Sequence, residues 1–240
     1  MQVIKAGSAE RLGVEAADLV EKFVRSSLSP ALGLATGGSV LPIYRELIRR
    51  HQEEGLSFAS AQGFLLDEYL GLDTDHPQLY RNVIQTRFTG RVGFDPAGVH
   101  SPNARPDDLD EECHRYDLLV TNARIGLQIL GVGRNGHLAF NEPGSPFDSR
   151  TRVVGLAPET RADNARFFPR PDQVPTRAIT QGLATIMQAK HLLVVASGAS
   201  KAPAVRDCLQ GPIGECCPVT ILRTHPRVTM ILDPDAAGAL

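Results

Sequence analysis

Short apolar runs alternate with amphipathic stretches along almost the whole chain, and this alternation restricts the fold more than any other feature. Five runs are typical of buried strands because they are short and apolar. They lie at residues 31–35, 63–66, 125–130, 191–196 and 228–232. Between them, apolar residues at helical spacing, or acidic residues that suit a helix start, predict helices. The predicted helices cover residues 8–27, 40–48, 78–88, 107–122 and 200–210.

Strands that alternate with helices predict an α/β fold with a mostly parallel central sheet, covered by helices on both faces. A chain of 240 residues is long enough for one large domain of this kind. No segment rich in Pro, Gly and Ser divides the chain as a linker would. We therefore expect a single domain over residues 1–240.

The composition argues against several classes of protein. Hydrophobic residues make up 42% of the chain and charged residues 22%, which is typical of an ordered globular protein. The formal net charge of −2 argues against a general nucleic-acid binder. No signal peptide is visible, and no apolar run approaches the roughly 20 residues that span a bilayer. The four cysteines lack C-x-x-C spacing, so we expect reduced thiols in a cytoplasmic protein without membrane or nucleic-acid partners.

Residues 143–177 are the most irregular part of the chain, with six prolines and many charges. A long polar segment inside a compact domain is often an active-site lid. A plain surface excursion agrees equally well with the composition. We predict a lid at residues 143–177 and keep the surface excursion as the alternative.

The segment Thr36-Gly37-Gly38-Ser39 lies between a predicted strand and a predicted helix. Glycines there allow a sharp turn that exposes backbone N–H groups, and the following helix adds positive potential, so the turn suits an anion such as phosphate. The alternative is a tight turn in which Ser39 caps the helix.

A second glycine-rich segment, Gly131-x-Gly133-x-x-Gly136, matches the dinucleotide-binding fingerprint and follows a predicted strand. A nucleotide-binding turn must open a helix, whereas Pro143 stops this segment almost at once, so we do not expect NAD. Within the segment, His137 offers an imidazole that titrates near neutrality, and Glu142 offers a carboxylate that can orient it. A structural histidine is the alternative. No His or Cys with metal-ligand spacing accompanies His137, so we expect no metal.

Three further charged residues are candidates for the same site. Asp67 directly follows the strand at 63–66, where a carboxylate can take a proton from a bound substrate. Lys201 follows Ser197-Gly-Ala-Ser200, which is another strand-to-helix turn with a glycine, and Arg166 lies in the predicted lid. If both cations face Thr36–Ser39, they surround a phosphate dianion. A capping role for Asp67 and solvated surface charges for Lys201 and Arg166 are the alternatives.

Taken together, several segments resemble one family, the glucosamine-6-phosphate deaminases, also called glucosamine-6-phosphate isomerases. The matching segments are Leu34–Ser39, Leu66–Leu72, Gly131–Pro143, Ser149–Arg152, Thr160–Phe168, Gln173–Pro175 and Ser197–Lys201. They occur in the family's order over residues 31–232. Each segment alone has low specificity, but the ordered set is highly specific.

The resemblance implies a modified Rossmann-like, three-layer fold and an enzyme that converts glucosamine 6-phosphate and water to fructose 6-phosphate and ammonia. It implies that Asp67 moves a proton between C2 and C1, and that His137 opens the sugar ring with support from Asn135 and Glu142. It implies no metal and no organic cofactor. The residues that it implies around the phosphate are Thr36, Gly37, Gly38, Ser39, Arg166 and Lys201.

The chain departs from the family pattern at several positions. Asn135 stands where the family often has Asp, so it can orient the imidazole but cannot stabilise imidazolium by charge. Val40 replaces a common proline after the phosphate turn. In allosterically activated members, paired serines and a lysine stand where this chain has Ser145-Pro146 and Val154. Arg152 is retained. The chain ends soon after Asp233. We expect no such activation, and a homo-oligomer stays an open alternative to a single chain.

Three other functions compete with the deaminase. The related 6-phosphogluconolactonases usually carry Asp-Glu-Arg and a His followed by Thr-Ala-Ser-Leu-Phe, whereas this chain has Tyr69 and Leu-Ala-Phe-Asn-Glu. A galactosamine 6-phosphate deaminase differs only in substrate stereochemistry at C4. A non-catalytic sugar-phosphate sensor needs only the phosphate contacts, so the presence of Asp67, His137 and Glu142 together argues against it.

Overall fold

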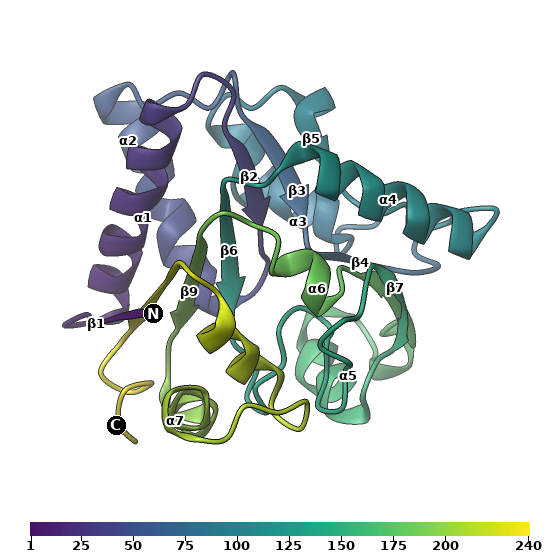
Figure 1. The fold of residues 1–240 in the computed structure, drawn as a ribbon. Helices are drawn as coiled ribbons and strands as arrows, with labels where there is room; N and C mark the ends of the chain where they lie inside the picture. Colours follow the sequence, from purple (N-terminus) through teal and green to yellow (C-terminus); the bar gives the residue numbers. More distant parts are fainter.

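A seven-stranded parallel sheet forms the centre of the computed structural model, which describes residues 1–240 (Figure 1). Its strands follow the order β1-β10-β9-β6-β2-β3-β5, and every neighbouring pair is parallel. The strands are β1 Gln2–Lys5, β2 Ala31–Leu34, β3 Gln62–Leu65, β5 Val99–His100, β6 Leu127–Gly131, β9 Leu192–Ala196 and β10 Val228–Leu232. This arrangement confirms the predicted α/β class and the mostly parallel sheet.

The middle strands of this sheet are buried on both faces. Every residue of β9 and β10 is buried, so neither strand shows the polar alternation of a half-exposed sheet. Helices on both sides remove these side chains from water and complete the three-layer, Rossmann-like architecture (Figure 1). The edge strand β1 was not predicted, because most of its residues are exposed and it lacks a buried apolar run.

Seven α-helices surround the sheet. They are α1 Ala9–Ser26, α2 Leu41–Glu54, α3 Tyr80–Arg87, α4 Leu109–Ala123, α5 Pro158–Asn164, α6 Leu183–Ile186 and α7 Ala202–Gln210. The acidic start predicted for α4 is confirmed, since the Asp108 carboxylate accepts hydrogen bonds from the Asp110 and Glu111 N–H groups at 2.8 and 3.0 Å. None of the helices is both long and apolar enough to cross a lipid bilayer.

A second, antiparallel sheet of three strands was not predicted. It has the order β4-β8-β7, with β4 Asp67–Tyr69, β8 Arg177–Thr180 and β7 Arg152–Gly155. Residues 143–177 are therefore more regular than their composition indicates, since they contain β7 and α5. A small apolar cluster holds this part together and consists of Tyr69, Phe140, Leu156, Phe168, Val174 and Ala178.

The first two helices meet at a close contact that positions the start of α2. A Cβ atom added to Gly13 of α1 would lie 2.6 Å from Pro42 Cβ and 2.7 Å from the Pro42 carbonyl carbon. Only glycine allows this approach, because real Cβ atoms do not come so close to backbone. Pro42 is the second residue of α2, which directly follows the turn at Thr36–Ser39.

We expect Gly13→Ala to lower the free energy of unfolding by about 1–3 kcal/mol, because overpacking a close contact costs this much. Helix propensity alone predicts the opposite sign, since alanine favours a helix over glycine by roughly 1 kcal/mol. Urea denaturation of both this variant and Gly7→Ala measures the effect. Gly7 has open space around an added Cβ, so it serves as the matched control. A more stable Gly13→Ala protein would contradict the close contact.

Candidate active site

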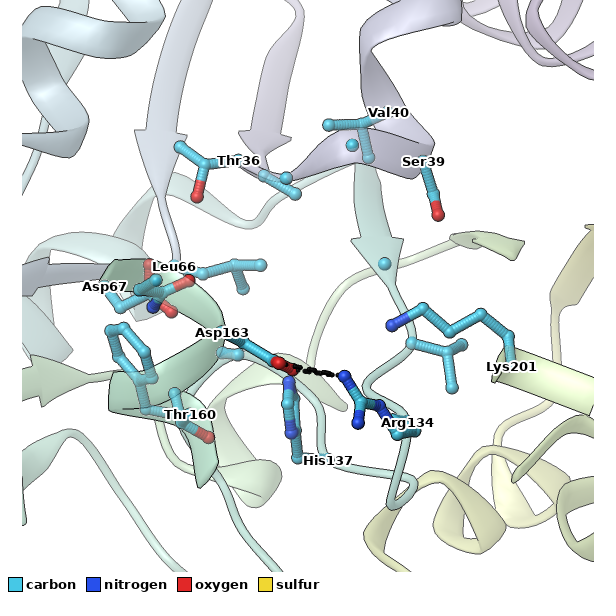
Figure 2. Close-up of a pocket in the computed structure, with 18 of the residues that line it drawn as sticks. Thr36, Ser39, Val40, Leu66, Asp67, Arg134, His137, Thr160, Asp163 and Lys201 are labelled. Atoms are coloured by element: carbon cyan, nitrogen blue, oxygen red, sulfur yellow. Dashed lines mark hydrogen bonds and ion pairs between the residues drawn. The ribbon is translucent and has the colours of Figure 1, made fainter. Parts of the chain in front are cut away.

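A cavity of about 380 Å³ opens at the carboxyl edge of the parallel sheet, where β3, β2, β6 and β9 end as neighbours. Ligands of open α/β sheets bind at this edge. Asp67 follows β3, Thr36–Ser39 follow β2, His137 follows β6 and Lys201 follows β9 (Figure 2). Eight of the predicted site residues line the cavity, namely Thr36, Gly37, Gly38, Ser39, Asp67, His137, Arg166 and Lys201.

Two turns of the same design form one end of the cavity. In each, a glycine with positive φ follows a strand, at Gly37 (φ 112°) after β2 and at Gly198 (φ 92°) after β9. A short 3₁₀ turn then leads into the next helix. Ser39 caps no helix through its side chain, so the capping alternative is wrong, and its side chain faces the cavity instead (Figure 2). Such turns present N–H groups to an anion.

An aspartate near the end of the chain holds the second turn in place. The Asp233 carboxylate accepts hydrogen bonds from the Ser197 hydroxyl at 2.5 Å and from the Gly198 N–H at 3.0 Å. Its pKa is lowered, because these hydrogen bonds together with backbone N–H groups outweigh burial. This anchor was not predicted, since Asp233 lies 36 residues from Ser197.

Lys201 brings a cation without a carboxylate partner to the cavity. It forms no ion pair, and burial is the main reason that its pKa is lowered, followed by the charge of Arg134. Arg166 also lacks an ion pair, and its guanidinium carbon lies 4.8 Å from the centre of the Phe167 ring. Two cations that line one cavity without a carboxylate of their own favour an anionic ligand.

Asp67 supplies a buried carboxyl group to the opposite part of the cavity. The residue is 7% exposed, and no protein group donates a hydrogen bond to its carboxylate. Burial, followed by the negative charge of Glu68, raises the pKa of the Asp67 carboxyl well above its usual range. A carboxylate that is desolvated and unpaired is a strong base once it is ionised.

The neighbouring Glu68 is buried and faces away from the cavity. Its carboxylate accepts hydrogen bonds from the backbone N–H groups of Tyr69, Tyr80 and Arg81 at 2.8–2.9 Å. Burial raises the pKa of Glu68 to about 7 despite these hydrogen bonds. Glu68 therefore fixes the start of α3 and places a titratable charge beside Asp67. Its position next to Asp67 was visible in the sequence, but its partners were not.

His137 is held by a chain of side chains behind the cavity. The Asn135 Oδ1 atom lies 2.8 Å from His137 Nδ1, and the Asn135 Nδ2 group donates to the Glu142 carboxylate at 2.7 Å. Asn135 and Glu142 do not line the cavity but support the imidazole from behind. Burial raises the pKa of Glu142, but hydrogen bonds with His137, Thr160 and Asn135 outweigh burial and hold it at about 2. Glu142 is thus ionised at neutral pH.

One glycine of the apparent nucleotide fingerprint, Gly133, makes room for this histidine. A Cβ atom at Gly133 would lie 2.3 Å from the His137 ring, so only glycine allows the imidazole to fold back on the turn. The segment after Gly136 forms no helix, whereas a dinucleotide-binding turn must open one.

Helix α5 closes one side of the site through three contacts that were not predicted. Thr160 donates a hydrogen bond to Glu142, and Asn164 donates to the Tyr69 hydroxyl at 2.8 Å. Asp163 forms an ion pair with Arg134 at 2.8 Å across the cavity (Figure 2). The predicted site residues thus lie in one place, and the groups that connect them were not predicted.

Known proteins resemble this chain over almost its whole length. The family model described as glucosamine-6-phosphate isomerases/6-phosphogluconolactonase matches residues 5–231. The chain is 48% identical to a glucosamine-6-phosphate deaminase of Pseudarthrobacter chlorophenolicus, over 100% of this chain and 93% of the relative. It is 45% identical to a glucosamine-6-phosphate deaminase of Bacillus velezensis, over 99% of both chains.

Solved structures also resemble this chain. A structure described as a monomeric glucosamine-6-phosphate deaminase superposes with a TM-score of 0.98 at 43% identity and covers 100% of both chains. The 6-phosphogluconolactonase of Trypanosoma cruzi shares the fold with a TM-score of 0.79 but only 18% identity, over 100% of this chain and 96% of that one. The chain belongs to the glucosamine-6-phosphate isomerase/6-phosphogluconolactonase family.

Proposed function

We propose that this chain is a glucosamine-6-phosphate deaminase, which converts glucosamine 6-phosphate and water to fructose 6-phosphate and ammonia. The observation that carries the proposal is one cavity that contains an unpaired buried carboxyl group, an imidazole and two glycine turns with a lysine. Isomerisation of an amino sugar needs a base beside C2 and a proton shuttle at the ring oxygen. The relatives named above carry this name, which supports the proposal.

The phosphate of the substrate binds between the turns Thr36–Ser39 and Ser197–Lys201. Backbone N–H groups of the turns and the side chains of Ser39, Lys201 and Arg166 surround the dianion. The phosphate is remote from the reacting carbons, so its binding energy fixes their position without taking part in the chemistry.

His137 opens the pyranose ring. The Glu142 carboxylate only accepts hydrogen bonds, so it orients the Asn135 amide with its oxygen toward His137. The His137 Nδ1 atom must then carry the proton, which leaves the Nε2 lone pair free for the substrate. Nε2 takes the proton of the C1 hydroxyl group and returns it to the ring oxygen as the C1–O5 bond breaks. This produces the open-chain aldehyde.

Asp67 then moves a proton between adjacent carbons. Its carboxylate removes the C2 proton while the ammonium group of the substrate supplies a proton to O1, which gives an enolamine. The Asp67 carboxyl group returns its proton to C1 and leaves a C2 iminium ion. Water adds to this ion and releases ammonia, so that C2 becomes the ketone of fructose 6-phosphate. A positioned acid–base group contributes about 10²–10⁴-fold to such a step.

Residues 143–177 act as the lid over the bound sugar. Helix α5 supplies Thr160, Asp163 and Asn164 to the cavity wall, and Arg166 follows directly after it. This placement supports a segment that moves away for substrate entry and returns to exclude water. Arg166 then reaches the phosphate only when the lid is closed.

The proposed reaction also suggests a cellular role. A hydrolytic deaminase of this kind belongs to the catabolism of amino sugars such as N-acetylglucosamine, and its phosphorylated substrate is found in the cytoplasm. The solved relative is described as monomeric, which supports a single chain as the catalytic unit.

The first test is an assay of the purified protein with glucosamine 6-phosphate, in which ammonia and fructose 6-phosphate are both measured. We expect the two products in equal amounts. Faster turnover of galactosamine 6-phosphate would reassign the sugar, and hydrolysis of 6-phosphogluconolactone instead would support the lactonase. Binding of the sugar phosphate without any product would support the sensor.

We expect Asp67→Asn to lower kcat at least about 100-fold and to leave KM nearly unchanged, because the base is lost while the phosphate contacts remain. Steady-state kinetics of this variant, with Asp75→Asn as the control, measures the effect. Asp75 is exposed and lies outside the cavity, so its replacement should not change turnover. Normal turnover of Asp67→Asn would remove this residue from the mechanism.

The raised pKa of Asp67 predicts the pH dependence of the enzyme. The base works only when ionised, so kcat/KM should fall as the pH drops through a value well above the usual carboxyl range. The charge of Glu68 contributes to this shift, so Glu68→Gln should move the acidic limb of the profile to lower pH. An unchanged limb, or one displaced to higher pH, would contradict the coupling of the two carboxyl groups.

A further inference from the structure

Arg134 lines the cavity but has no part in the reaction derived above. It lies on the turn between β6 and His137, and its guanidinium group faces into the cavity (Figure 2). Its Nη2 atom lies 2.8 and 2.9 Å from the two carboxylate oxygens of Asp163. Asp163 belongs to α5, so the ion pair joins two opposite walls of the cavity.

The cavity already holds one anionic group among its cations, namely the Asp163 carboxylate of this ion pair. Asp67 and Asp163 are the only acidic residues that line the cavity. Burial is the main cause of the lowered pKa of Lys201; the charge of Arg134 lowers it further, and that of Asp163 raises it. Arg134 and Asp163 therefore both act on the lysine that faces the phosphate turns. The Asp163 carboxylate is the single negative charge among these cations.

We propose that Arg134 is a further phosphate-binding residue, and that Asp163 occupies its guanidinium group until the sugar phosphate arrives. The proposal rests on the proposed function of the same cavity. A phosphate dianion offers more charge and more acceptor oxygens than one carboxylate, and guanidinium binds it with two parallel hydrogen bonds. The exchange of partners does not involve any covalent step.

Because Arg134 and Asp163 are exposed to water, the exchange of partners costs little free energy. The side chain of Arg134 is 64% exposed and that of Asp163 is 53% exposed. An ion pair in contact with water contributes little to stability, so its loss is a small obstacle to substrate binding. Both side chains are also free to move without disturbing the core. Asp163 then competes with the substrate for Arg134 and repels the incoming phosphate.

A purely structural role for the pair predicts a different pattern. If the ion pair only holds α5 against the turn, the loss of either partner has the same effect on substrate binding. If Arg134 binds phosphate, the two losses have opposite effects. Arg134→Gln removes a contact with the substrate, whereas Asp163→Asn releases Arg134 for the phosphate.

The experiment compares KM and kcat of Arg134→Gln, Asp163→Asn and the double variant with those of the wild type, using glucosamine 6-phosphate at low ionic strength. Inhibition by inorganic phosphate is measured in the same assays. Arg206→Gln is the matched control, because Arg206 is 51% exposed, pairs with Asp207 and lies outside both the cavity and the lid. It removes the same charge from the protein without touching the site.

We expect Arg134→Gln to raise KM and the inhibition constant of phosphate about tenfold or more, since a contact between charged groups is lost. Its kcat should stay within about twofold, because the uniform binding lost with a phosphate contact affects KM alone. Asp163→Asn should lower both constants or leave them unchanged, and the double variant should resemble Arg134→Gln.

Two outcomes would overturn the inference. One is an unchanged KM in Arg134→Gln, and the other is an equal rise of KM in both single variants. Failure of the proposed function is recognised separately, because the wild type then releases no ammonia. Normal KM and kcat in Arg206→Gln ensure that a rise in Arg134→Gln reflects the site and not the net charge.

Discussion

The parallel pairing of β3, β2, β6 and β9 is the constraint on which the site depends. Parallel strands bring their carboxyl ends to one edge of the sheet, so residues that follow four separate strands meet there. Asp67, Ser39, His137 and Lys201 reach the cavity in this way, although they lie far apart in the chain. A shift of one strand by a single residue would turn its side chains to the other face.

The site also contains arrangements that cost stability and serve binding or chemistry. Burial of Asp67 without a hydrogen-bond donor disfavours its charged form, which is unfavourable for folding at neutral pH but makes the carboxylate a stronger base. Its raised pKa means that this residue stabilises the fold least at high pH, where it must be ionised. Gly37 and Gly198 adopt backbone conformations that other residues rarely accept, so that N–H groups face the proposed phosphate site.

The sequence predicted the parallel sheet and most of the site because both depend on local patterns. Buried strands are continuous apolar runs, and each glycine turn lies directly after one of them. The small sheet of β4, β8 and β7 was missed because its strands are only three or four residues long and pair across distant parts of the chain. The contacts from Thr160 to Glu142 and from Asn164 to Tyr69 join residues 18 and 95 positions apart, which no local pattern indicates.

We propose that one cavity holds the phosphate at the two glycine turns while C2 of the sugar faces residue 67. A crystal structure of the Asp67→Asn variant with glucosamine 6-phosphate tests this arrangement most directly. The variant is expected to react slowly, so it should retain the unreacted substrate in the crystal. We expect the phosphorus atom between Ser39 and Lys201, and C2 within about 3.5 Å of the side chain at position 67, as proton transfer requires. A phosphate bound elsewhere, or a sugar whose C2 faces another wall, would contradict the account.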